Sequence, residues 1–452
     1  MGDSSGTLIS PAQEQALGEA FFRSLHSQVV INQDAEIQQY IESIGQKLVA
    51  NSDTPGNPFH FFVVMDNAIN AFAGPGGYIG INSGLILTTE AESELASVIA
   101  HEVAHVTQRH LYRAFEAASR LSLPTAAATL AAILLGTQSP ELAQAAIMAV
   151  QAGSVQFQID FTRDNEQEAD RVGMQTLAAS NFDPRSMPIF FERLQQSSRY
   201  YGRGIPEFLR THPVTSSRIS DTRGRAEKYP YQQYPDSLSY LLAQAKLRVI
   251  GANDYAAALK YFEPRLSQGT QQQRAVARYG VGLIHLSRQD YPEAEKIFQE
   301  LTDLYPEQPH YATALARTAL EAQNYRTALT RFKTTLNRFP DNQAVKLDTI
   351  SAMLKAGEAE QARGVLQTLA PKIKRQPIYY KLLARIYGDL KQPAESHRYL
   401  AEYYYSMGQT EAAILQIRLA QKAPDLNYYL SAILNERLVF FLREEEQRKR
   451  NQ

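Results

Sequence analysis

The chain contains no cysteine and no tryptophan among its 452 residues, and it has no excess of charge of either sign. The absence of cysteine excludes disulfide bonds, cysteine nucleophiles and thiolate metal sites, although it does not fix the compartment. The 46 basic residues balance 47 acidic ones, and no block carries the surplus of Lys and Arg that phosphate binding requires. We therefore expect no nucleic-acid partner, and any metal site must use histidine and carboxylate ligands.

The sequence also lacks the run of about 20 continuous apolar residues that a membrane-spanning helix needs. Residues 121–135 are apolar but are followed by the polar break 136–140, and Gln144 interrupts the next apolar stretch, Leu142–Val150. We interpret the two stretches as a helical hairpin that is either buried in the protein or in peripheral contact with a membrane surface. Residues 1–9 have no signal-peptide pattern, which is compatible with a cytosolic start or with a mature chain whose signal has been removed.

The first half of the chain mixes helical and strand patterns. Apolar residues recur at helical spacing over residues 11–30 and 37–48. Residues 61–65 and 78–81 are typical of short strands, and the Gly-rich turn at residues 74–77 lies between them. After this small sheet the pattern is almost wholly helical.

A Tyr- and Pro-rich connector separates this half from a second one. At about 100–200 residues per domain, the length of the chain suggests two or three domains. We predict a first domain over residues 1–228, a stiff and packed linker over residues 229–237, and a helical domain over residues 238–452.

The second half repeats with spacings of 36, 34, 34 and 34 residues. The repeat is anchored at Tyr255, Tyr291, Tyr325, Ala359 and Pro393. Three positions after each anchor stands a small residue, and seven positions after it stands Phe or Leu. A period of 34 with a small and then a large apolar residue indicates tetratricopeptide repeats, because the small residue lets two helices approach closely. This half is therefore predicted to be an α-solenoid.

The sequence His-Glu-Val-Ala-His at residues 101–105 carries the clearest chemical signal. Residues four apart on a helix lie on nearly the same face, so His101 and His105 can direct ring nitrogens at one ion. Glu102 lies about 100° round the helix, where it can reach a water molecule at the ion without binding the ion itself. Because a catalytic zinc site needs a third protein ligand, the acidic helix at residues 165–170 supplies the candidates Glu166 and Asp170. One carboxylate would bind the metal and the other a histidine ring N–H, while Glu168 would point away from this face.

These motifs resemble a known family. His-Glu-Val-Ala-His, the later Asn-Glu-Gln-Glu-Ala-Asp-Arg-Val-Gly and the earlier Asn-Ala-Phe-Ala-Gly-Pro-Gly-Gly-Tyr-Ile-Gly resemble the zinc endopeptidases grouped with HtpX and the CAAX prenyl endopeptidase. The resemblance covers roughly residues 10–228 and implies a zincin-like α+β fold with one Zn²⁺ per chain. It implies that His101, His105 and Glu166 are the zinc ligands, that Glu102 is the general base, and that Asp170 supports a ligand.

The same resemblance implies a role for the strand that begins near Gly77. Gly77, Tyr78, Ile79 and Gly80 would border the cleft as an edge strand and pair with an extended peptide substrate. With the repeats attached, the whole chain is similar to periplasmic proteases that assist the assembly of outer-membrane proteins. The implied partners are outer-membrane β-barrel proteins and their assembly machinery, and the implied activity is proteolytic and chaperone-like. The alternative is a zinc-stabilised, non-proteolytic adaptor that acts through the repeats.

Three roles are open for His212, which precedes Pro213 in a loop-like stretch. It could stabilise the oxyanion, serve as a fourth zinc ligand that silences the resting enzyme, or be structural. Arg218 is expected to be solvated at the surface more than to contribute charge to the cleft. His110, five positions after His105, is expected to lie on the wrong face of the helix for the same ion.

Overall fold

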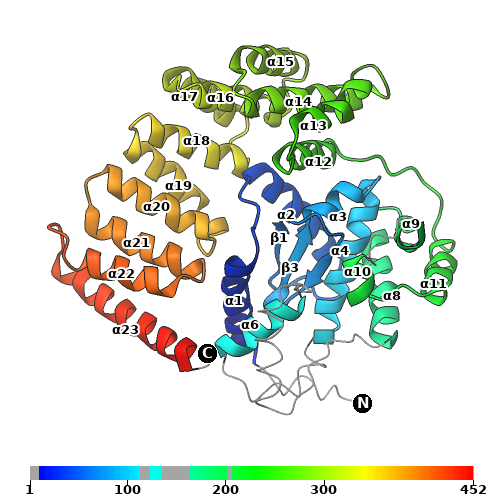
Figure 1. The fold of residues 1–452 in the computed structure, drawn as a ribbon, viewed down its shortest axis with the longest axis horizontal. Coiled ribbons are helices and arrows are strands. Elements are labelled where there is room, and N and C mark those ends of the chain that lie inside the picture. The colour runs from blue at the N-terminus through cyan, green and yellow to red at the C-terminus, as the bar shows by residue number, and fades with distance from the viewer. Residues whose placement is uncertain (1–9, 112–122, 135–162, 201–205, 451–452) are drawn as a thin grey trace. The chain divides into compact units, whose positions relative to one another are not determined.

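The computed structural model describes residues 10–111, 123–134, 163–200 and 206–450 (Figure 1). They fall into two compact units, which are described separately. Unit 1 is formed by Met1–Gln33 and Tyr40–Tyr240, and unit 2 by Asp34–Gln39 and Leu241–Gln452. The assignment of residues 34–39 to the second unit is not predictable from the sequence pattern.

Unit 1 combines helices with a small sheet, as the sequence predicts. Its elements in chain order are α1 (Pro11–Gln28), most of α2 (Ala35–Val49), β1 (His60–Val64), β2 (Ala71–Ala73), β3 (Tyr78–Asn82), α3 (Ser83–Thr88), α4 (Glu92–Thr107), α6 (Leu123–Leu134), α8 (Arg163–Ala179), α9 (Ser186–Tyr200), α10 (Glu207–Thr211) and α11 (Ser216–Ala226). Helix α1 begins at the predicted Ser10-Pro11 signal, because Ser10 caps it in a capping box with Gln13.

Among the described residues, three strands form one sheet in the order β1-β3-β2. Strand β3 is parallel to β1 and antiparallel to β2. The prediction that Gly77, Tyr78, Ile79 and Gly80 form an edge is therefore wrong, because Ile79 and Gly80 pair with β1 on one side and with β2 on the other. The sequence did not indicate β2, because three residues are too few for a recognisable alternation.

Helices cover both faces of this sheet. On one face, Phe62 of β1 and Phe72 of β2 pack in a core with Phe21 of α1 and Leu130 of α6. On the other face, Phe61 lies against Gly45 of α2, where a Cβ atom would approach its ring to 2.4 Å. The sheet therefore fixes the positions of α2 and α4 relative to the glycine-rich turn.

The predicted helical hairpin is seen in part. Helix α6 corresponds to its first arm, and Ala126, Ala127 and Leu130 of this arm are buried against α1. The second arm, Leu142–Val150, lies outside the described residues. None of the described helices is long and apolar enough to cross a membrane.

The end of the connector packs on the first turn of α4. The Asp236 carboxylate accepts a hydrogen bond from the backbone N–H of Glu92 at 2.7 Å. The Glu92 carboxylate in turn accepts hydrogen bonds from the hydroxyl groups of Ser237 at 2.7 Å and Tyr40 at 3.1 Å. Because Ala91 offers no capping side chain, Asp236 satisfies an N–H group that would otherwise lack a partner.

Unit 2 contains consecutive antiparallel helices (Figure 1). They are α12 (Leu238–Ile250), α13 (Tyr255–Phe262), α14 (Gln271–Ser287), α15 (Tyr291–Leu304), α16 (Pro309–Glu321), α17 (Tyr325–Arg338), α18 (Gln343–Lys355), α19 (Ala359–Ile373), α20 (Pro377–Asp389), α21 (Pro393–Ser406), α22 (Thr410–Ala420) and α23 (Tyr428–Arg450).

The predicted repeat is confirmed in register. Each of the five anchors is the first residue of α13, α15, α17, α19 or α21. In the first four repeats the small residue and the large apolar residue are buried, and the Phe262 ring fills the space that Gly280 of α14 leaves open. In the fifth, Ser396 and Leu400 are only half-buried, and Ala394 and Ala401 are buried instead.

A buried group of charges joins residues 34–39 to the repeats within unit 2. The Lys246 ammonium of α12 lies 2.7 Å from an Asp34 carboxylate oxygen and also contacts Glu36. The Arg317 guanidinium of α16 lies 2.7 Å from Asp348 and 3.5 Å from Asp34. The Gln39 side chain accepts a hydrogen bond from the α18 backbone at 2.8 Å. The acidic start of α2 is thus held by cations from two different repeats.

Candidate metal centre

Helix α4 presents its two histidines at one point. The Nε2 atoms of His101 and His105 lie 3.0 Å apart, as their spacing of four residues predicts. Both side chains are buried, and every residue from Glu92 to His105 is buried as well. The helix is therefore surrounded by protein on all sides, which holds the two rings in fixed positions.

Helix α8 adds the carboxylates. Glu166 approaches His101 Nε2 at 3.4 Å and His105 Nε2 at 3.3 Å. Asp170, one turn later, contacts the other ring nitrogen of His101, Nδ1, at 3.0 Å. The structure thus brings both predicted carboxylates to the two histidines. Glu168 points elsewhere and contacts His110, as described below.

Gly173 sets the distance between these two helices. A Cβ atom at this position would lie 3.1 Å from the backbone of Ala100 and His101. Because backbone atoms cannot rotate away, any larger residue must push α8 off α4 at the level of His101.

We expect Gly173→Ala to weaken metal binding, because the displaced helix carries Glu166 and Asp170. The expected cost to folding stability is about 1–3 kcal/mol, the usual price of overpacking. Metal affinity and thermal unfolding of the variant should both fall. Gly224→Ala in α11 is a matched control, because nothing lies within 4 Å of a Cβ atom there. Equal metal affinity in Gly173→Ala and the wild type would contradict this account of α8.

His212 completes the group. It caps α10, with its backbone N–H donating to the Phe208 carbonyl at 2.7 Å, and its ring stacks on the Phe208 ring at 4.9 Å. Its Nδ1 atom lies 3.0 Å from Glu166 Oε1 and 3.4 Å from His101 Nε2. The side chain is 2% exposed, so it occupies the centre of the site and not a solvated loop.

These side chains have the arrangement of a metal site. Ligand atoms of His101, His105, Glu166 and His212 all lie within 4.8 Å of one another. Four ligands at 2.0–2.1 Å in tetrahedral geometry are separated by about 3.3 Å. The separations between these side chains given above, 3.0–3.4 Å, are close to that value. The donor set of imidazoles and a carboxylate therefore fits a tetrahedral divalent cation.

The electrostatics of the site also favour a cation. Burial alone would lower the pKa of His101, but hydrogen bonds and negative charge from Asp170 and Glu166 raise it to about 9. Burial also lowers the pKa of His105 well below its ordinary value, so this ring is neutral and able to bind a metal. Burial acts in the opposite direction on Glu166, but the neighbouring His212, His101 and His105 hold its pKa well below the usual range. Glu166 is therefore ionised, as a ligand must be.

Glu102 lies beside the group and not in it. Its carboxylate approaches His212 Nε2 at 3.5 Å, and it interacts with the backbone of Ala73 in β2. Burial raises the pKa of Glu102 above its ordinary value, against the opposing influence of His212 and His101. A raised pKa suits a carboxylate that takes up a proton near neutral pH.

The expectation that Arg218 is solvated is wrong, since its side chain is 3% exposed. The guanidinium donates two hydrogen bonds to the Asp170 carboxylate, both at 2.7 Å, and lies 2.7 Å from Glu166 Oε2. Burial alone would raise the pKa of Asp170, but the Arg218 hydrogen bonds and charge lower it. A sequence signal existed, because Arg218 shares one helical face with the buried Ile219, Thr222 and Ala226.

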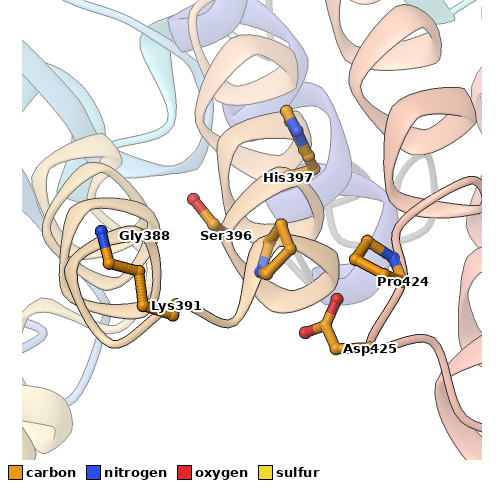
Figure 2. A pocket seen from close by; sticks show the side chains of 7 residues that line it. Gly388, Lys391, Ser396, His397, Pro424 and Asp425 are labelled. Carbon is orange, nitrogen blue, oxygen red and sulfur yellow. The ribbon is translucent and has the colours of Figure 1, made fainter.

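A separate cavity of about 490 Å³ lies in unit 2, between the start of α21 and the turn before α23 (Figure 2). Its lining includes Lys391, His397 and Asp425. Asp425 accepts a hydrogen bond from the Ala394 N–H at 3.0 Å, and His397 Nδ1 lies 2.7 Å from the Gln416 amide oxygen. Two of the polar side chains in this cavity are therefore engaged in holding the last repeats together.

Comparison with known proteins agrees with this organisation. Residues 35–226 match the model of peptidase family M48, and residues 249–318 and 319–386 match that of the tetratricopeptide repeat. The chain is 36% identical over 389 residues to the beta-barrel assembly-enhancing protease of Yersinia pestis, with 85% of this chain and 79% of the relative covered. It is 34% identical over 417 residues to that of Escherichia coli K12, with 92% and 85% covered. A putative member from Vibrio cholerae is 40% identical over 318 residues, with 70% of this chain and 65% of the relative covered.

The predicted resemblance is thus confirmed in both halves of the chain. Metalloendopeptidases from mitochondria are also similar to the first half, for example one from Arabidopsis thaliana that is 29% identical over 185 residues, 41% of this chain and 35% of the relative. The prediction of a metalloendopeptidase is confirmed with it. The chain belongs to the family of the beta-barrel assembly-enhancing proteases, with a peptidase family M48 region followed by tetratricopeptide repeats.

Proposed function

We propose that this chain is a zinc endopeptidase in which one Zn²⁺ is held by His101, His105 and Glu166. The observation that carries the proposal is the convergence of these buried side chains on one point. Two imidazoles, one carboxylate and tetrahedral spacing are a typical set for catalytic zinc, and no cysteine in the chain offers a competing thiolate site. Residues 1–228 are the catalytic domain, residues 229–237 the linker and residues 238–452 the repeat domain.

Catalysis at this centre depends on Glu102. The bound ion polarises the scissile carbonyl and acidifies water. Glu102 accepts the proton from the attacking water and passes it to the leaving amine, for which its raised pKa is suited. Because Ala73 of β2 lies beside Glu102, and β2 is the outer strand of the described sheet on this side, a peptide substrate would pair with β2 and not with β3.

Asp170 and Arg218 orient the centre from behind. His101 Nδ1–H donates to Asp170, which leaves Nε2 as the ligand atom. Arg218 holds both Asp170 and Glu166, so that one cation fixes the third ligand and the partner of the first. The two carboxylates therefore keep one orientation whether or not a substrate is present.

His212 is proposed to be the fourth ligand of the resting enzyme. Its Nδ1 lies at ligand distance from Glu166 and His101, and its Nε2 faces Glu102. In this position the ring occupies the place that water needs and contacts the base that would activate it. His212 must then move away before catalysis, which makes the activity dependent on a substrate or partner.

Replacement of His212 tests this role. His212→Ala should raise kcat/KM for a quenched fluorescent peptide by about tenfold or more, if the displaced conformer is a tenth of the population or less. His397→Ala in the repeat domain is the matched control and should leave the rate unchanged. A clear loss of activity in His212→Ala would assign the histidine to oxyanion stabilisation, and an unchanged rate would leave it a structural role.

The cellular substrate follows from the relatives and not from the geometry. Because relatives over most of this chain are named for β-barrel assembly, we propose that it cleaves stalled outer-membrane β-barrel proteins in the periplasm and promotes the assembly of others. The repeat domain would bind these proteins and their assembly machinery, as solenoid surfaces commonly do. A non-proteolytic adaptor remains the second candidate, because the repeats alone could perform that part.

A further inference from the structure

His110 lies against the second histidine of the metal centre. On a continuous helix a residue five positions after His105 would lie about 140° round the axis. Helix α4, however, ends at Thr107, and Arg109 adopts a left-handed conformation with φ 56°. This turn brings His110 back toward the helix, so that its Nδ1 atom lies 3.0 Å from His105 Nδ1. The His110 side chain is fully buried.

The other nitrogen of His110 contacts a carboxylate. Its Nε2 atom lies 3.1 Å from Glu168 Oε2. Glu168 is on α8, two residues after Glu166, and its outer oxygen lies 3.7 Å from Arg171. The chain of contacts therefore runs from α8 through His110 to the ligand helix α4.

One assignment of protons satisfies every link. His105 Nε2 faces Glu166 and His101, so Nε2 is the ligand atom and Nδ1 carries the proton. That proton is donated to His110 Nδ1, which must then be an acceptor. The His110 proton consequently resides on Nε2 and is donated to Glu168.

We propose that Glu168 and His110 are positioning residues that fix the ring and tautomer of His105 for the metal ion, an inference that depends on the proposed metal site. The two ligand histidines then have equivalent support. His101 donates directly to Asp170, whereas His105 donates to Glu168 through the imidazole of His110. Outer hydrogen bonds of this kind orient a ligand and increase its basicity, and their loss costs about 10–100-fold in metal affinity.

The test is the affinity of the metal-free full chain for Zn²⁺, measured by competition with a chromophoric chelator. His110→Phe keeps a ring of similar size but has no acceptor, so its dissociation constant should rise about 10–100-fold. His110→Asn places an amide oxygen near the original Nδ1 and should restore part of the affinity. Glu168→Ala leaves His110 in place and should weaken binding severalfold. In the zinc-loaded wild type, the His105 Nδ1 proton should be protected from solvent exchange in ¹H–¹⁵N spectra, and in His110→Phe it should exchange rapidly.

His285 provides a matched control. It contacts Asp290 five positions later at 2.8 Å, across the left-handed residue Gln289 with φ 62°, so the local geometry is the same but lies in the repeats. His285→Phe should leave zinc affinity unchanged. The inference is overturned if His110→Phe binds zinc as tightly as the wild type, if His285→Phe weakens binding equally, or if Asn at position 110 is no better than Phe. A wild-type chain that binds no zinc would overturn the proposed metal site itself.

Discussion

Glu102→Gln should abolish peptide cleavage while the protein keeps its metal ion. Glutamine has almost the same shape as glutamate but cannot accept the proton of the attacking water. The residue lies outside the group of converging ligand atoms, and its contacts are to His212 and the Ala73 backbone. Loss of a general base typically reduces the rate by about 10²–10⁴-fold. The variant should therefore be inactive in a peptide assay and contain as much metal per chain as the wild type.

Glu90→Gln is the matched control for this substitution. Glu90 precedes α4, and its side chain is 77% exposed, so the same chemical change there should alter neither rate nor metal content. Retained cleavage in Glu102→Gln would remove the residue from its assigned role. Loss of metal in the same variant would show that Glu102 is a ligand.

Lys246→Met should cause the largest loss of stability. Lys246 is the cation that Asp34 and Glu36 share, and its side chain is 4% exposed. Removal of one partner from a buried ion pair leaves uncompensated charge and typically costs about 3–5 kcal/mol. Hydrogen exchange of the full chain should show this loss in the backbone amides of α12 and α16. Lys355→Met is the control, because Lys355 and its partner Glu321 are about half exposed and such pairs contribute about 0–1 kcal/mol.

The same variant should change the dependence of stability on pH. Burial alone would raise the pKa of Asp34 and Glu36, but the charge of Lys246 and its neighbours lowers both below their ordinary values. Because the folded pKa values are depressed, the stabilisation is present above about pH 4–5, the unfolded range, and is lost as the pH falls further. Without Lys246 the buried carboxylates favour protons, so the difference from the wild type should shrink below that pH. A difference that stays constant down to pH 3 would contradict this assignment.

The sequence was most informative where the chemistry follows one helix. The spacing of His101 and His105 determines a shared face on any straight helix, and so does the spacing of Glu166 and Asp170. The repeat anchors were predictable for a similar reason, since each begins a helix and the small residue after it lies at a helix contact. These predictions needed only local geometry.

Residues that reach the site from a distance, or after a break in a helix, were not predictable. Arg218 was assigned to solvent because an arginine in a polar stretch is usually exposed, and only the fold supplies Asp170 as its buried partner. His110 was excluded on helical spacing, and the left-handed conformation of Arg109 invalidates that spacing. The edge-strand prediction for β3 failed because β2 was not visible in the sequence pattern. In each case a tertiary contact decided the outcome.

The central claim is that this chain cleaves peptide bonds with a metal ion at His101, His105 and Glu166. The most direct test is digestion of casein by the His212→Ala variant, with and without a chelator, because His212 no longer blocks the centre. We predict cleavage that the chelator stops and that added Zn²⁺ restores. If casein remains intact in the metal-loaded variant, or is cleaved equally well with the chelator present, the protein does not work through this metal centre.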